Sequence, residues 1–247
     1  MFLLHICNKR CKFAKALTLE NTPFLKKIKY LHISFKTELK NYELPAFRGA
    51  VIAQAGEENT LFHNHVDEGF RYQYPLIQYK VRRGQAGIVC LQDGTEEIYH
   101  FFQSRNTLLH IGERAVQAEI DTLTLKEFPL QIWDTQFPYY INRWLALDQN
   151  SYKLYHALES ETEQLDFLAR ILRGNILSMA KGLDWFIEQE VKVNIQRIER
   201  VNLVKYKGIK FQAFDVRFDS NVSLPDAIGL GKGAALGFGS VAVLRKG

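Results

Sequence analysis

The segment Ile228–Val241 reads IGLGKGAALGFGSV and holds five of the chain's 16 glycines within eleven residues. Glycine reaches positive φ angles and allows close backbone approach, because it has no Cβ. Successive backbone N–H groups in such a segment can converge on phosphate oxygens. Residues 228–239, the glycine-rich loop, are therefore predicted to bind phosphate groups. A tight turn between two strands is the alternative, although few turns need so many glycines.

Two common phosphate-binding motifs do not fit this loop. A Walker loop requires Ser or Thr after its lysine, but Lys232 is followed by Gly233. A dinucleotide fingerprint requires a long helix after the glycines. Here only the short apolar run SVAVLRK follows, which predicts a final strand. The loop is thus expected between two strands at the end of the fold.

Working back from the loop, the chain shows two cycles of strands and helices. The first has strand patterns at 28–36, 72–91 and after 107, with helices at 44–56 and 96–105. LLHIGE and AVQAEIDTLTL are expected to supply the closing strands, and 57–71 a polar loop. This β-α-β-β-α-β order is typical of a ferredoxin-like lobe.

The second cycle begins near Glu127 and has an expanded helical region. FPLQIWD predicts a strand, TQFPYYINRWLALDQNSYKLYHALES is expected to lead into a helix, and 161–183 is the strongest helix. Strands are predicted at 191–206, 207–220 and 240–246. We therefore predict an α+β protein of two tandem ferredoxin-like lobes, 27–126 and 127–247, preceded by a poorly ordered extension, 1–26. No linker rich in Pro, Gly or Ser separates the lobes, so they are expected to pack together.

Composition restricts the partners and the compartment. Lys and Arg number 32 against 27 Asp and Glu, a net charge of +5 that suits a polyanion. Three cysteines give no disulfide framework, which favours a reducing compartment such as the cytoplasm. No apolar run is long enough to span a membrane. Neither a metal site nor a cofactor site is predicted.

Three segments together resemble the CRISPR-associated endoribonucleases of the RAMP superfamily, which cut precursor CRISPR RNA within each repeat. These segments are ELPAFRGAVI, LFHNHVDEGFRYQYPLIQYK and SLPDAIGLGKGAALGFGSV, and the resemblance extends from about Lys27 to Arg245. It implies two RRM-like folds facing a shared basic cleft. It also implies cleavage without metal that leaves a 5′-hydroxyl and a 2′,3′-cyclic phosphate. The implied partner is CRISPR repeat RNA, with effector-complex subunits and a homodimer left open.

The resemblance places the active site in the loop that contains His63 and His65. Attack by a ribose 2′-hydroxyl needs a general base, and the leaving 5′-oxygen needs a general acid. Histidine suits both steps because its pKa lies near neutrality. In an extended segment, residues two apart point the same way, so both imidazoles are expected to face one phosphate. A metal site or a simple loop contact is the alternative for such a pair.

Further site residues are predicted around these histidines. Because family sites add side chains that hold the phosphate, Tyr74 and Lys80 are candidate catalytic residues. Arg48, Arg82 and Arg83 are candidate RNA-binding residues. In the glycine-rich loop the candidates for RNA binding are Gly229, Gly231, Lys232, Gly233, Gly237 and Gly239. A catalytically inactive RNA-binding subunit of an effector complex is the alternative function, and a nucleotide-binding protein is a more remote one.

Overall fold

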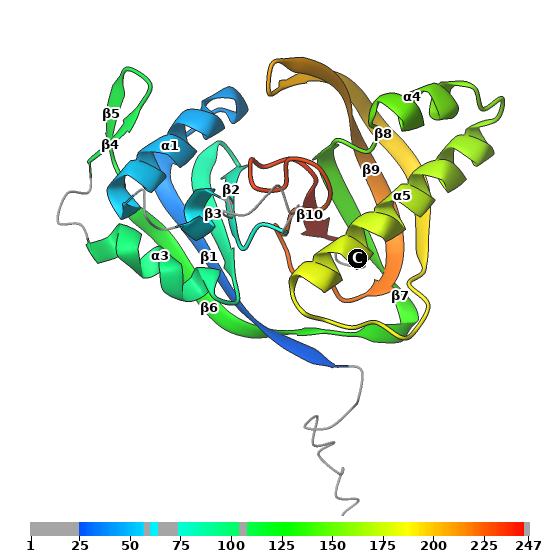
Figure 1. Cartoon of the computed structure of the whole chain (residues 1–247), viewed down its shortest axis with the longest axis horizontal. Helices are drawn as coiled ribbons and strands as arrows, with labels where there is room; N and C mark the ends of the chain where they lie inside the picture. Colours follow the sequence, from blue (N-terminus) through cyan, green and yellow to red (C-terminus); the bar gives the residue numbers. More distant parts are fainter. Residues whose placement is uncertain (1–24, 57–59, 64–73, 104–107, 245–247) are drawn as a thin grey trace, which may run out of the picture.

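The computed structural model describes residues 25–56, 60–63, 74–103 and 108–244 and shows two lobes, each built on a four-stranded antiparallel sheet (Figure 1). The strands are β1 (Lys26–Glu38), β2 (Ile77–Arg82), β3 (Gln85–Leu91), β4 (Leu108–Ile111), β5 (Arg114–Gln117), β6 (Ile120–Leu130), β7 (Ile132–Trp144), β8 (Val193–Tyr206), β9 (Ile209–Val222) and β10 (Ser240–Val243). The helices are η2 (Asn41–Glu43, a 3₁₀ turn), α1 (Leu44–Ala55), α2 (Thr60–His63), α3 (Gly94–Gln103), α4 (Gln149–His156) and α5 (Glu161–Gly182).

The first sheet has the strand order β2-β3-β1-β6, with α1 and α3 on one face (Figure 1). The alternation of side chains in β1 explains this arrangement, since Leu31, Ile33 and Phe35 all point toward the helices. The Phe35 ring meets Phe47 of α1 edge-on at 5.9 Å and Phe101 of α3 at 6.2 Å. The predicted ferredoxin-like lobe is confirmed.

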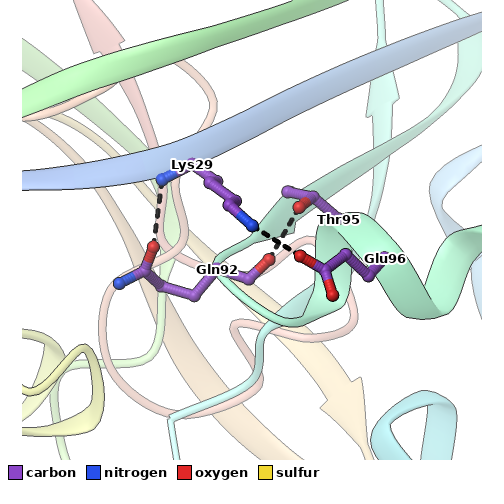
Figure 2. Close-up of polar contacts among 4 residues, drawn as sticks. All are labelled: Lys29, Gln92, Thr95 and Glu96. Carbon is purple, nitrogen blue, oxygen red and sulfur yellow. Dashed lines mark hydrogen bonds and ion pairs between the residues drawn. The ribbon is translucent and has the colours of Figure 1, made fainter.

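The helix ends follow the local sequence. Pro45 lies in the first turn of α1, and Gly56 ends it at a φ of 98° with its N–H bonded to the Ile52 carbonyl. Figure 2 shows how the start of α3 is tied to β1. The Lys29 ammonium lies 2.5 Å from the Glu96 carboxylate, and the Lys29 N–H donates to the Gln92 side chain. These groups are exposed, so they orient the helix more than they stabilise it.

The closing strand of the first lobe is a correction to the sequence prediction. Residues 108–117 do not join the main sheet, because they fold on themselves as the separate β4–β5 hairpin. The turn between them is Gly112-Glu113, and Gly112 has a φ of 61°. Leu109 and Ile111 are buried in the core of this lobe. The fourth strand of the main sheet is β6 alone, which pairs with β1.

The second sheet has the order β10-β7-β9-β8, which is again ferredoxin-like. Residues 135–144, expected to lead into a helix, belong to strand β7, and the helix begins only after Asp148 caps α4. The predicted helix at 161–183 is confirmed as α5, capped by Ser160. Between β9 and β10 the residues 223–239 contain no helix, so the glycine-rich loop takes the place of the second helix of the usual fold.

The two lobes share part of one hydrophobic core. The chain passes from β6 to β7 at Gln131, a few residues beyond the boundary expected at 126. The face of β1 opposite the helices carries Ile28 and Tyr30, which are buried in one cluster with Trp144 and Ile176 of the second lobe. Close packing of the lobes, expected from the missing linker, is confirmed.

Candidate functional site

The glycine-rich loop lies between the two lobes (Figure 1, red) and pairs with the edge of the first sheet. The Tyr79 N–H of β2 donates to the Ala235 carbonyl over 2.9 Å, next to a parallel bridge between Tyr79 and Leu236. Within the loop, the Leu230 N–H donates to the Gly239 carbonyl over 2.9 Å. The Gly239 N–H also donates to the Arg143 carbonyl of β7 over 3.3 Å, so the loop is fastened to both lobes through its backbone.

The glycines of the loop are required by its own packing. Gly231, Gly233, Gly237 and Gly239 all have φ between 60° and 80°, which side chains rarely allow. A Cβ on Gly239 would lie 2.0 Å from the Leu230 carbonyl oxygen, and one on Gly229 would lie 2.8 Å from the Lys80 ammonium. The conformation of the loop and its close contacts thus account for the glycine spacing, and phosphate binding by these residues stays a prediction.

We expect Gly239→Ala to destabilise the protein by about 3 kcal/mol, because it combines an unfavourable φ with a backbone clash. Gly84→Ala is the matched control, since Gly84 also has a positive φ of 80°, but a Cβ added there would meet no atom within 4 Å. It should cost only about 1 kcal/mol. Urea denaturation of both variants measures the difference, and equal losses would contradict the packing argument.

A buried polar network joins β2 to the loop. The Tyr74 hydroxyl donates to the Gly229 carbonyl over 2.7 Å and accepts from the Gln78 side chain over 3.0 Å. The Gln78 side-chain oxygen accepts the Gly229 N–H at 2.8 Å. The Lys80 ammonium donates to the Ala234 carbonyl at 3.2 Å. Residues predicted to act on the substrate therefore hold the backbone that carries Lys232.

Burial dominates the electrostatics of this network. Only 2% of Lys80 is exposed, and burial lowers the pKa of its ammonium to about 7. Burial also raises the pKa of the Tyr74 phenol. In the described arrangement neither side chain reaches the surface, so their observed contacts are those of positioning residues.

Arg48 lies beside the segment with the predicted catalytic histidines. Its guanidinium donates to the Phe62 carbonyl at 3.2 Å from one nitrogen and 3.4 Å from another, and the Phe62 side chain is buried in the first lobe. His63 is the last residue of the helical turn α2, not part of the extended segment that was expected, and Phe62 before it is buried. The side chain of His63 and the whole of His65 lie outside the described residues.

The second lobe contributes a further group of cations and aromatic rings. Lys232 of the loop places its ammonium 4.7 Å from the Phe211 ring centre. Arg143 of β7 places its guanidinium 4.4 Å from the Phe238 ring centre and donates to the Asn41 side chain over 2.7 Å. The Phe238 ring meets the Tyr206 ring at 5.3 Å.

Arg48 connects this group to the first lobe. The Arg48 guanidinium lies 6.0 Å from the ring centre of Tyr79, whose N–H donates to the Ala235 carbonyl of the glycine-rich loop. Burial raises the pKa of Tyr206, and the positive charge of Arg48 opposes that rise. We call Arg48, Arg143, Lys232, Tyr206, Phe211 and Phe238 the cation–aromatic cluster. Cations and aromatic rings together suit phosphates and unpaired bases.

The structure separates the two arginines of the β2–β3 turn. Arg82 forms an ion pair with Asp226 of the second lobe. Arg83 is exposed at the tip of the turn, with a φ of 51°. Arg143 was missed by sequence reasoning, because its strand was taken as the approach to a helix. An arginine in an alternating, aromatic-rich stretch was the signal that could have revealed it.

Comparison with known families gives two matches that together span nearly the whole described chain. The Cas6b N-terminal domain matches residues 26–129, and the Cas6b C-terminal domain matches residues 131–244. An uncharacterized protein of Methanocaldococcus jannaschii is 39% identical over 102 residues, which cover 41% of this chain and 68% of that protein.

Solved structures show the same fold. A crystal structure of Cas6b superimposes with a TM-score of 0.79 at 27% identity, covering 89% of this chain and 100% of the other. A crystal structure of the CRISPR RNA processing endoribonuclease Cas6b gives a TM-score of 0.65 at 24% identity, with the same coverage. Among the described helices, none is both long and apolar enough to cross a membrane.

Proposed function

This chain belongs to the Cas6b family, and from that premise we propose that it is an endoribonuclease that cuts precursor CRISPR RNA within its repeats. The two-lobe fold shared with a CRISPR RNA processing endoribonuclease supports this assignment, as does the glycine-rich loop. The net charge of +5 suits an RNA ligand, since cations release the counterions of a phosphate backbone.

The position of Arg48 carries the proposal. Its guanidinium binds the carbonyl of the residue directly before His63 and lies 6.0 Å from the ring centre of Tyr79, which pairs with the glycine-rich loop of the other lobe. A phosphate beside His63 would therefore lie close to Arg48 of α1. The cation–aromatic cluster extends from Arg48 to Lys232 of the glycine-rich loop, which adds a second cation. Positive charge placed where charge develops in a transition state is a large part of catalysis.

The proposed reaction needs only groups of this chain and the RNA itself. One of His63 and His65 takes the proton of the ribose 2′-hydroxyl, whose oxygen attacks the adjacent phosphorus. The bond from phosphorus to the 5′-oxygen breaks, and the other histidine protonates that oxygen. The products are a 2′,3′-cyclic phosphate and a 5′-hydroxyl. Tyr74 and Lys80, predicted at the same site, serve in this proposal to fix the loop that carries Lys232.

Incubation of the purified protein with a labelled repeat RNA in EDTA tests the proposal. Site-specific cleavage is expected, and the upstream product should end in a cyclic phosphate. An RNA with a single 2′-deoxyribose at the cleaved position is the control, because it lacks the attacking hydroxyl and should bind uncut. Repeat RNA that binds but stays intact would instead favour a catalytically inactive RNA-binding subunit.

The salt slope is the slope of the logarithm of the RNA dissociation constant against the logarithm of salt concentration. We expect Lys232→Gln to lower this slope by about 0.7 to 0.9, the value of one lost phosphate contact. The wild-type affinity itself should fall steeply with salt. Lys181→Gln removes an exposed lysine at the end of α5 and should leave the slope unchanged. Equal slopes for wild type and Lys232→Gln would contradict phosphate binding by Lys232.

A further inference from the structure

A hollow of about 590 Å³ opens on the first lobe beside the turn between β2 and β3. It is bounded by that turn, the end of β1, the η2 turn and the β4–β5 hairpin. Four cations line it, Lys36, Lys40, Arg83 and Arg114, against two carboxylates, Glu38 and Glu43. A volume of this order lies within the range of small-ligand sites, roughly 300 to 1,000 Å³.

Positive charge remains in the hollow after its ion pairs are formed. Arg114 lies 2.6 Å from the Glu43 carboxylate, and Lys36 is paired with Glu119 outside the hollow. Among the described residues, Arg83 and Lys40 form no ion pair, and Glu38 is the single unpaired carboxylate of the lining. The hollow therefore favours an anionic ligand.

Tyr42 gives the hollow an exposed aromatic face. Its side chain is 76% exposed, and the Lys40 ammonium lies 6.0 Å from its ring centre. The turn that carries it is fixed, because the Glu43 carboxylate accepts the Lys40 N–H at 2.8 Å and the Leu39 N–H donates to the Gly84 carbonyl over 2.8 Å. A ring held outward on a rigid turn is a ready platform for stacking.

The hollow adjoins the proposed catalytic region. Asn41, the residue before Tyr42, accepts a hydrogen bond from Arg143 of the cation–aromatic cluster over 2.7 Å. Tyr42 and the cluster are thus separated by one residue of a fixed turn. Tyr42 and Arg83 both line the hollow, so an RNA strand bound at the cluster has an aromatic ring and a cation nearby.

We propose that this hollow is a second nucleotide subsite, in which a base of the RNA substrate stacks on Tyr42 while its phosphate contacts Arg83. The inference rests on the proposed function, since it names a part of the same RNA that does not undergo cleavage. An RNA segment fits better than an acidic protein, because the residue beside Tyr42 contacts Arg143 of the cluster and the hollow combines one aromatic face with separated cations. The subsite sets affinity and leaves the chemical step unchanged.

The affinity of repeat RNA with a 2′-deoxyribose at the cleaved position tests the stacking. Tyr42→Ala should weaken binding about tenfold, and Tyr42→Phe should bind as the wild type does, because the ring remains. Tyr99→Ala is the matched control, since Tyr99 of α3 is similarly exposed at 62%. Arg83→Gln should lower the salt slope by about 0.7 to 0.9, while Arg170→Gln, an exposed arginine of α5, should not.

The outcomes separate this inference from the proposed function. Both positions are exposed, so unchanged thermal melting should confirm that the variants fold. If the wild-type protein neither binds nor cuts repeat RNA, the proposed function is wrong and the subsite with it. If the wild type binds and cuts while Tyr42→Ala and Arg83→Gln bind as tightly as it does, the subsite alone is wrong. A loss in Tyr42→Phe equal to that in Tyr42→Ala would also overturn stacking.

Discussion

Replacing His63 and His65 together with alanine is expected to lower the single-turnover cleavage rate of repeat RNA by about 10³-fold or more. General acid and base groups each contribute about 10² to 10⁴ in rate. The dissociation constant of the RNA should change by less than about threefold, because Arg48 and Lys232 remain. Rapid quench of a saturating protein excess with labelled RNA gives the rate, and filter binding gives the affinity.

A matched double variant shows whether the loss belongs to this pair of histidines. His100 of α3 and His110 of β4 are both exposed on the first lobe, so His100→Ala/His110→Ala removes the same atoms elsewhere. It should cut at the wild-type rate. Cleavage by His63→Ala/His65→Ala at the wild-type rate would show that other groups move the protons. The pH dependence of each single variant then assigns the acid and the base.

Much of the fold could be predicted because its strands and helices carry local periodicity. In β1, Leu31, Ile33 and Phe35 alternate with polar residues, and one face of α5 repeats Leu168, Leu172 and Ile176 at helical spacing. These patterns reflect burial on one face, which the structure confirms. The alternation does not depend on knowing the partner element, so it is visible before the fold is known.

The errors arose where pairing partners decide the structure. Residues 108–117 were expected in the main sheet, but the Gly112-Glu113 pair is a two-residue hairpin turn that folds them back on themselves. That signal was present and was not used. Strand β7 was taken as an approach to a helix, although its Tyr139 and Ile141 alternate with Tyr140 and Asn142 on the other face of the strand.

The site was harder to predict than the fold. Gln78 and Lys80 alternate with apolar residues in β2 as a solvent-facing row would, yet both are buried. The glycine-rich loop covers them, and it lies about 150 residues away along the chain. A contact of that range leaves no local pattern, so the motif could be located from sequence while its partners could not.

The burial of Lys80 leads to a prediction about stability and pH. Lys80→Met is expected to raise the free energy of unfolding at pH 7 by about 3 kcal/mol. An unfolded lysine has a pKa near 10.5, and burial lowers it to about 7 in the folded protein, a difference worth about 4 kcal/mol at neutral pH. Losing the hydrogen bond to the Ala234 carbonyl offsets about 1 kcal/mol. Methionine has a similar length and carries no charge.

The sign of the pH dependence follows from proton binding. Between pH 7 and 10.5 the unfolded state holds a proton on this lysine that the folded state has lost, so the stability of the wild type rises with pH across that window. Below pH 7 both states are protonated and the cost is constant. The stability advantage of Lys80→Met should therefore shrink by about 2 kcal/mol between pH 7 and 9.

Urea denaturation at both pH values, with Lys181→Met as an exposed control, isolates Lys80 because all other groups cancel in the difference. Wild-type and Lys80→Met stabilities that stay parallel with pH would mean that Lys80 is not held neutral.

The cleavage rate of the same variant then distinguishes two roles. A lysine that touches the phosphate would lose about 10²-fold in rate on replacement. The observed contact with the Ala234 carbonyl fits a positioning role, for which we expect a loss below about tenfold together with weaker RNA binding, since the loop carrying Lys232 is less firmly held.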